Sequence, residues 1–178
     1  AEILLPNIGL NPNRTGILEV LIEMGANITV NNKTTDMGEP RGDILVKSSK
    51  LQGINIDKNT IPKIIDEIPI LSLAACFAST QTIIDDAEEL RVKESDRIKA
   101  TVSGLSKLGA DIQETEQGMI INPSNKLIGN QVESYGDHRI AMMLGIAGLL
   151  SDKTTIIEGA EHASVSYPNF WDEIESKK

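Results

Sequence analysis

Two short charged stretches carry the residues that could do chemistry in this chain. Arg91-Val-Lys-Glu-Ser-Asp-Arg97 and Gly136-Asp-His-Arg139 each place acidic and basic side chains within a few residues, directly before an apolar segment. Guanidinium groups bind carboxylates and phosphates, and carboxylates transfer protons. The two stretches therefore predict a site for a small anionic substrate whose reaction needs proton transfer.

The first stretch offers two kinds of group. Lys93 is a point charge with three donors, whereas Arg97 is a planar fork suited to a carboxylate or a phosphate. Glu94 stands between these cations and could act as a general acid or base. The alternative interpretation is a solvated helix start with local ion pairs, each of which contributes about 0–1 kcal/mol.

The second stretch has an Arg in an unusual place. Asp137 can cap the helix that follows, and Arg139 then lies in the first helical turn, where the helix dipole disfavours a cation. That mismatch indicates a functional role for Arg139. His138 could transfer protons or simply bond a backbone group. Asp66 reads as another helix cap, but it could also project into a cleft if the helix starts converge.

Internal repeats show which elements must position these groups. Segment 18–28 matches segment 102–112, and each predicts an amphipathic helix that ends at a glycine, Gly25 or Gly109, followed by a strand. Segment 66–78 resembles 137–150, and each predicts an Asp-capped helix that is apolar on most sides and therefore buried. Strands follow at 82–84 and 154–157.

The repeating unit is strand, helix, strand, helix and two strands, and its copies are circularly shifted and partly truncated. We therefore expect an α+β fold of βαβαββ units around a pseudo-threefold axis, with buried helices inside and mostly four-stranded sheets outside. This is an inside-out α/β barrel-like arrangement in a single globular domain, 1–178. Segment 32–41 is rich in turn formers and is predicted to be an exposed loop.

Composition excludes several classes of function. The net charge of −9 argues against nucleic-acid or membrane-surface binding, and no apolar run is long enough to span a membrane. With two His and one Cys, a structural zinc site is not expected. Cys76 is predicted to be a small core residue, which fits a reducing compartment. We expect a cytoplasmic monomer.

At these motifs the chain resembles the 5-enolpyruvylshikimate-3-phosphate synthase (3-phosphoshikimate 1-carboxyvinyltransferase) family. The resemblance rests on 91–97, on Tyr135-Gly-Asp-His-Arg-Ile-Ala-Met142, on 65–70 and 105–110, and on Ser166-Tyr-Pro168. It implies transfer of the enolpyruvyl group of phosphoenolpyruvate to the 5-hydroxyl of shikimate 3-phosphate, with release of phosphate. It implies no metal and no organic cofactor. It also implies that the enzyme acts in the shikimate pathway of aromatic amino-acid biosynthesis and is a target of glyphosate.

The resemblance also implies roles for individual residues. Asp66 matches the carboxylate that contacts the reacting hydroxyl and acts as base, and Glu94 matches the second proton-transfer residue. Lys93 matches a group near the hydroxyls of shikimate 3-phosphate. Arg97 and Arg139 match the pair that holds the carboxylate of phosphoenolpyruvate. A sixth residue, His138, matches a site residue of lesser role.

Two departures from the family pattern are visible. Some members have Lys where this chain has Val165, so we assign no phosphate contact there. Family enzymes also have about twice as many residues in two domains, so we expect this chain to be the C-terminal domain, without the N-terminal domain that is its partner, and inactive alone. The alternatives are the sister enzyme that acts on UDP-N-acetylglucosamine and a non-catalytic anion-binding module. Intact Asp66, Lys93, Glu94 and both arginines favour descent from an active enzyme.

Overall fold

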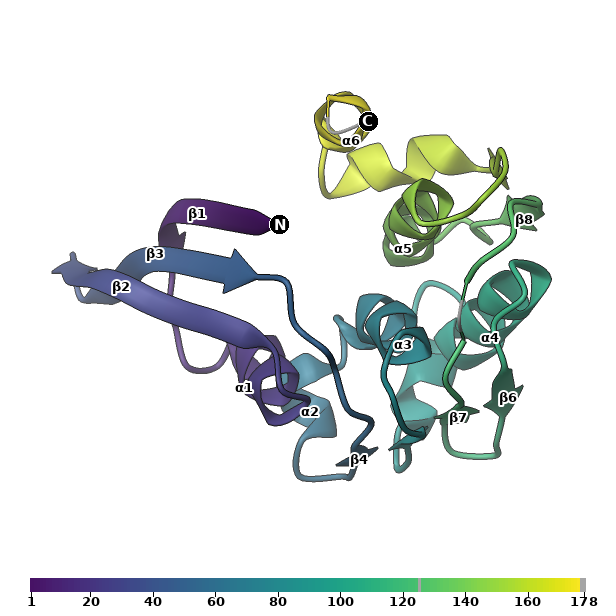
Figure 1. Cartoon of the computed structure of the whole chain (residues 1–178), viewed down its shortest axis with the longest axis horizontal. Coiled ribbons are helices and arrows are strands. Elements are labelled where there is room, and N and C mark those ends of the chain that lie inside the picture. Colours follow the sequence, from purple (N-terminus) through teal and green to yellow (C-terminus); the bar gives the residue numbers. More distant parts are fainter. Residues whose placement is uncertain (125, 177–178) are drawn as a thin grey trace.

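The chain folds into three successive groups of helices and strands, which the computed structural model describes for residues 1–124 and 126–176. Two helices, α3 (Ile68–Cys76) and α5 (His138–Leu149), lie side by side in the interior. The strands lie outside them, with one sheet below α3 and a strand pair to the right of α5 in Figure 1. This arrangement confirms the α+β class and the interior position of the apolar helices.

The middle group is a complete copy of the repeat. Its elements are β4 (Asn55–Ile56), α2 (Ile61–Ile64), α3, β5 (Thr82–Ile84), the 3₁₀ helix η1 (Glu88–Val92), α4 (Arg97–Lys107), β6 (Ile112–Glu114) and β7 (Met119–Ile121). Apart from α2 and η1, the order is the predicted strand, helix, strand, helix, strand, strand. The four strands form one sheet in the order β4-β5-β7-β6, with β4 and β5 parallel and the other pairs antiparallel.

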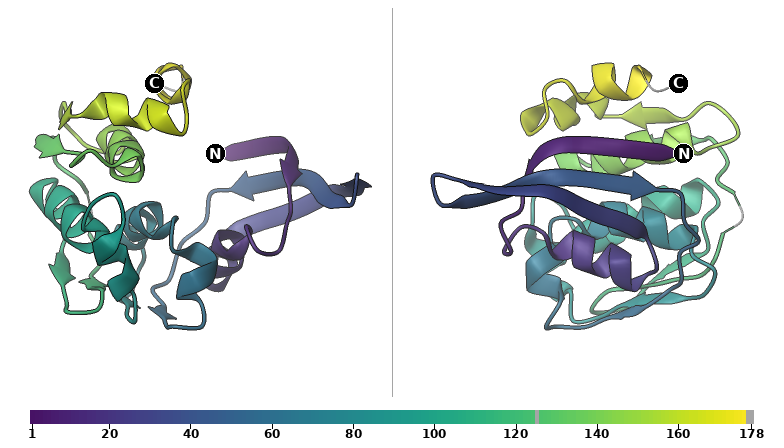
Figure 2. Two further views of the ribbon diagram at one scale, coloured as in Figure 1. Left: turned by 180° about the vertical axis from the view of Figure 1, so that it is seen from behind. Right: turned by 60° about the vertical axis from the view of Figure 1, so that its left-hand side comes forward.

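The first group corresponds to the second part of the repeat. It consists of β1 (Glu2–Gly9), α1 (Gly16–Glu23), β2 (Asn27–Asp36) and β3 (Glu39–Lys47). The three strands form an antiparallel sheet in the order β1-β3-β2. This sheet lies to one side of the other elements, and its β2–β3 turn extends away from them (Figure 2).

The third group corresponds to the first part of the repeat. It consists of β8 (Gln131–Glu133), α5, β9 (Ile156–Glu158), the 3₁₀ helix η2 (Ala160–Val165) and α6 (Phe170–Glu175). The two strands are parallel, like β4 and β5. One of the three sheets therefore has the expected four strands, and the others have three and two because the flanking copies are partial. The sheets do not close into a barrel within the described residues.

Backbone conformation supports the alignment of the copies. Asn7, Asp86 and Gly159 occupy matching places near the ends of β1, β5 and β9, and all three are left-handed, with φ of 54°, 55° and 72°. Gly25 and Gly109, which follow α1 and α4, have φ of 91° and 86°. Only glycine adopts such values at little cost, so the glycine-ended helices are as predicted.

The prediction of a loop at 32–41 was wrong. Strands β2 and β3 continue through this segment as a hairpin that turns at Met37 and Gly38, both of which have positive φ. The segment is mostly exposed, as predicted. Its turn formers misled the prediction because strand pairing depends on the neighbouring strand more than on intrinsic propensity.

The core is formed mainly by aliphatic side chains from the interior helices and the inner faces of the sheets. Leu71, Leu144 and Met119 are fully or almost fully buried. Cys76 is fully buried, which confirms its predicted place in the core. No helix in the described part of the chain combines the length and the apolar character needed to cross a bilayer.

Candidate active site

Three helix starts converge where the two charged stretches meet. Asp96 caps α4 through a hydrogen bond that its Oδ1 accepts from the Lys99 amide at 3.0 Å. Asp137 caps α5 by accepting from the Arg139 amide at 2.9 Å. The segment before α3 brings Asp66 to the same place. The caps fix the direction in which each helix leaves the site, and the charged side chains at the helix starts face one another.

Arg97 lies at the centre of the cluster, and its side chain is only 1% exposed. Its Nε donates to Asp137 Oδ2 at 2.8 Å, and its Nη2 donates to Glu94 Oε2 at 2.6 Å. Its Nη1 donates to Asp66 Oδ1 at 3.1 Å. One guanidinium group therefore joins carboxylates from three separate segments, as the planar fork of Arg allows.

Asp137 is a site residue that the sequence pattern identified only as a cap. It is fully buried, and it also accepts a hydrogen bond from Ser95 Oγ at 3.1 Å. Burial alone would raise the pKa of Asp137, but the hydrogen bonds from Arg97 and the Arg139 amide, with the charge of Arg97, hold this pKa below its ordinary value. The sequence feature that could have indicated this role is the place of Asp137 in the Gly-Asp-His-Arg motif, beside Arg139.

Asp66 bridges the two arginines. Its Oδ1 is 3.1 Å from Nη1 of Arg97, and its Oδ2 is 3.2 Å from Nη2 of Arg139. Arg139 also donates to the backbone oxygen of Asp66 at 3.1 Å and lies 3.8 Å from Glu67. The prediction that Asp66 caps α3 was wrong, because Glu67 holds the cap position and no side chain makes a capping bond there. Asp66 is instead free to pair with both cations.

The remaining predicted residues lie around this centre. Glu94 has a side chain that is 52% exposed, so it can reach solvent or a ligand. Lys93 points its ammonium group at Glu89, 2.9 Å away, one turn earlier in η1. His138 is the first residue of α5 and is partly buried. The structure thus brings together Asp66, Glu94 and both arginines, with Lys93 and His138 on adjoining segments.

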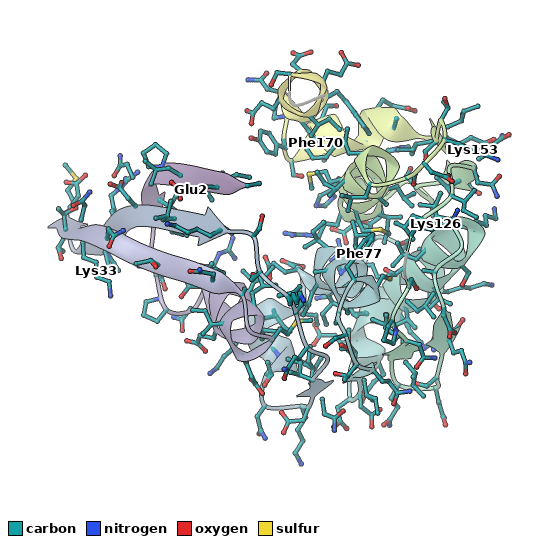
Figure 3. All side chains as sticks on the ribbon, viewed as in Figure 1. Glu2, Lys33, Phe77, Lys126, Lys153 and Phe170 are labelled. Atoms are coloured by element: carbon teal, nitrogen blue, oxygen red, sulfur yellow. The ribbon has the colours of Figure 1, made fainter. Side chains whose placement is uncertain are left out.

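A cavity of about 250 Å³ opens beside Asp66, Glu67 and Arg139. Its other walls are mostly apolar and come from α3, α5 and the C-terminal segment: Ile70, Met142, Met143, Ile146, Tyr167 and Phe170. Phe170, the first residue of α6 and labelled in Figure 3, packs against α5. The charged rim of this cavity, rather than its apolar floor, is therefore the part suited to an anion.

A second, smaller cavity of about 140 Å³ shares Asp66 and Glu67. Arg14 and Lys63 line it, and neither cation was singled out from the sequence because neither stands in a charged motif. Within residues 1–124 and 126–176, no three His, Cys, Asp or Glu side chains are grouped in a way that could hold a metal ion. The chemistry that the site offers is anion binding by guanidinium groups and proton transfer by carboxylates.

Comparisons with known proteins identify the family of this chain. The family described as EPSP synthase (3-phosphoshikimate 1-carboxyvinyltransferase) matches residues 1–174. A 3-phosphoshikimate 1-carboxyvinyltransferase of Bacillus cereus (strain B4264) is 51% identical over 175 residues, which cover 98% of this chain and 41% of that protein. One from Herpetosiphon aurantiacus is 50% identical over 171 residues, 96% of this chain and 40% of that protein.

Solved structures extend the comparison. An EPSP synthase from Acinetobacter baumannii superimposes with a TM-score of 0.93 at 41% identity, over 99% of this chain and 41% of that one. The enolpyruvyl transferase NikO from Streptomyces tendae, at 16% identity and a TM-score of 0.72 over 91% of this chain and 34% of its own, shares the fold. This chain spans about two fifths of the length of the curated relatives it matches. It belongs to the EPSP synthase (3-phosphoshikimate 1-carboxyvinyltransferase) family.

Proposed function

We propose that this chain supplies one domain of a two-domain enzyme that transfers the enolpyruvyl group of phosphoenolpyruvate to the 5-hydroxyl of shikimate 3-phosphate. The observation that carries the proposal is the carboxylate of Asp66 between the guanidinium groups of Arg97 and Arg139, at 3.1 and 3.2 Å. A base held between two anion-binding groups is the arrangement that this reaction needs, because a hydroxyl must attack an anionic acceptor.

The reaction has an addition and an elimination. In the addition, the hydroxyl oxygen forms a bond to C2 of phosphoenolpyruvate while C3 gains a proton and the hydroxyl loses one, which gives a tetrahedral intermediate. In the elimination, C3 loses a proton, the C2–C3 double bond returns, and the bond from C2 to the phosphate oxygen breaks to release inorganic phosphate. Each stage needs one group that accepts a proton and one that donates it.

The cations have a role that follows from their contacts. Arg97 and Arg139 would hold the carboxylate of phosphoenolpyruvate, which would take the place of the Asp66 and Glu94 oxygens now on Arg97. Asp66 and Glu94 are 38% and 52% exposed and can move aside, whereas the fully buried Asp137 cannot. Asp137 would therefore keep Arg97 oriented during the exchange.

The acids divide the proton transfers. Asp66, released from Arg97, would accept the proton of the attacking hydroxyl. Glu94, which bonds to the other terminal nitrogen of Arg97, would donate the proton to C3 in the addition and accept it in the elimination. Lys93, after leaving Glu89, would contact shikimate 3-phosphate, and His138 would have a lesser role at the start of α5.

Two observations, one from sequence comparison and one from the structure, support a second domain. The chain covers about 41% of the Bacillus cereus relative, so a comparable enzyme has substantial further sequence. Strand β1 also exposes Ile3, Leu4 and Leu5, with relative exposures of 59%, 57% and 42%, and such apolar surface is normally covered. We therefore expect the isolated chain to have negligible transferase activity, because the other half of the site is missing.

A chimeric enzyme tests the proposal. The segment of the Bacillus cereus relative that matches this chain, 175 residues at 51% identity, is replaced by this chain. The expected result is release of inorganic phosphate from phosphoenolpyruvate that depends on shikimate 3-phosphate. Arg139→Lys in the chimera should lower kcat/KM about 10- to 100-fold, because one donor fork is lost.

The controls separate function from folding. The unmodified relative sets the reference rate, and circular dichroism with thermal unfolding checks that the chimera is folded. A folded chimera that is inert with shikimate 3-phosphate, or that prefers UDP-N-acetylglucosamine as acceptor, would contradict the proposal.

A further inference from the structure

The side chain of Arg91 ties three parts of the structure together. Its Nη1 donates to Asp96 Oδ2 at 2.9 Å and to Glu114 Oε1 at 2.8 Å. Its Nη2 donates to the backbone oxygen of Thr115 at 2.7 Å, and its Nε donates to that of Glu116 at 3.1 Å. All three nitrogens are therefore engaged, and three of the four acceptors belong to the end of β6 and the turn that follows it.

The fourth acceptor, Asp96, connects Arg91 to the candidate active site. One oxygen of Asp96 takes the hydrogen bond from Arg91, and the other caps α4 by accepting from the Lys99 amide. Arg97 is the first residue of α4. The Arg91 guanidinium thus fixes the helix cap that immediately precedes the central arginine of the site.

The same ion pair closes a loop. Segment 92–95 lies between Arg91 and Asp96, and it carries Lys93 and Glu94. Val92 is 80% exposed, so burial of its side chain does little to hold the segment. Within the segment, Glu94 pairs with Arg97 and Ser95 donates to Asp137. Its two ends are joined by the Arg91 guanidinium group, which is itself bonded to the β6–β7 turn.

We propose that Arg91 is a positioning residue for the transfer reaction: by joining Asp96 to the β6–β7 turn, it holds the loop that presents Lys93 and Glu94. This inference rests on the proposed function. Arg91 itself touches neither arginine of the site and acts only through the loop and the helix cap. A displacement of about 1 Å in a reacting group can lower a rate about a hundredfold, so the geometry of this loop should matter for catalysis.

A purely stabilising role of Arg91 predicts a loss of thermal stability without a loss of kcat in the folded enzyme. Arg91, Asp96 and Glu114 have side chains that are 26%, 34% and 39% exposed, and partly exposed ion pairs contribute little to stability. Loss of the guanidinium should therefore disturb the loop more than the fold. Kinetic and thermal measurements on the same variant distinguish the two roles.

The variant is Arg91→Lys in the chimeric enzyme described above. Lysine keeps the positive charge but cannot reach four acceptors with a planar fork. We expect kcat to fall at least about tenfold, with a smaller change in KM for phosphoenolpyruvate and with the Tm lowered by less than about 4 °C. The control is Lys47→Met, which removes an exposed ion pair with Glu2 (3.0 Å) on the three-stranded sheet and should leave kcat unchanged.

A double-mutant cycle shows whether Arg91 acts through Glu94. In a Glu94→Gln background, Arg91→Lys should lower kcat by less than about twofold, because the proton-transfer group of the loop is already disabled and Lys93 is assigned to substrate binding. Independent effects that multiply, or an unchanged kcat in the single variant, would overturn the proposal.

Nuclear magnetic resonance relaxation of the 178-residue chain tests the loop without any assay. In Arg91→Lys, the amides of residues 93–95 should show exchange broadening while those in the middle of α4 do not. An unaltered loop would overturn the proposal whatever the chimera does. An inactive unsubstituted chimera that is folded would instead count against the proposed function, so the two failures are distinct.

Discussion

The carboxylate of Asp137 accepts a hydrogen bond from Nε of Arg97 at 2.8 Å, and this pair joins the start of α5 to the start of α4. The side chains of Asp137 and Arg97 are 0% and 1% exposed. The pair is therefore more deeply buried than the carboxylates Asp66 and Glu94, and it holds the Arg97 guanidinium in place within the candidate site.

Replacement of Asp137 should destabilise the fold strongly. Asp137→Asn leaves the buried guanidinium of Arg97 without its buried counter-ion, which costs about 3–5 kcal/mol in comparable cases. Urea unfolding followed by circular dichroism measures the loss. The matched control is Asp152→Asn, which removes an exposed partner of Lys126 at 3.6 Å and should cost less than about 1 kcal/mol. Equal losses in the two variants would show that the buried pair contributes no more to the free energy of unfolding than the exposed pair does.

The same pair predicts a dependence of stability on pH. The pKa of Asp137 lies below its ordinary value in the folded chain, so folding favours the ionised form. Its contribution is complete above the unfolded-state pKa of about 3.9 and is lost as the pH falls through the lower folded-state pKa. The free energy of unfolding should therefore fall more steeply below about pH 4 in the wild type than in Asp137→Asn. Parallel curves for the two proteins would contradict this assignment.

Cys76 should be unreactive in the folded chain. Burial raises the pKa of its thiol to about 12, against an ordinary value of 9.0. Since the thiolate is the reactive form, its population near pH 8 falls about a thousandfold, and the surrounding core also blocks access. Ellman's reagent should label Cys76 only after urea unfolding, and the chain has no other cysteine to confuse the result. Rapid labelling of the native chain would mean that the α3 core opens readily.

Hydrogen exchange should differ between two matching strands. Ile84 of β5 pairs with Met119 of β7. In β9, the Ile156 amide donates to Asn130 and the Glu158 oxygen accepts from Ser134, so both residues direct their backbone groups toward β8 and Ile157 directs its own to the opposite edge. Within the described residues, that edge of β9 pairs with no other strand.

The Ile84 amide should therefore exchange at least about a hundredfold more slowly than the Ile157 amide in the 178-residue chain. Nuclear magnetic resonance in heavy water measures both rates in one sample. Similar protection at the two amides would show that a further strand, from this chain or a second copy, already covers β9.

Much of the site could be predicted from local sequence. The charged stretches stand where helices begin, and Asp96 and Asp137 cap those helices as their residue types favour. The repeat could be recognised from the sequence because segments 18–28 and 102–112 each carry a helix period and a terminal glycine, Gly25 or Gly109. These signals depend on residues that are only a few positions apart, so they can be recognised without knowledge of the tertiary fold.

Only the tertiary structure decided which charges meet. Asp66 and Arg139 are far apart in the chain, and the packing of α3 beside α5 places them 3.2 Å apart. Packing also buried Asp137 and turned the predicted loop at 32–41 into paired strands. These outcomes depend on partners that are distant in sequence, because burial and ion pairing are properties of the assembled core, whereas caps and helix periods are properties of the local chain.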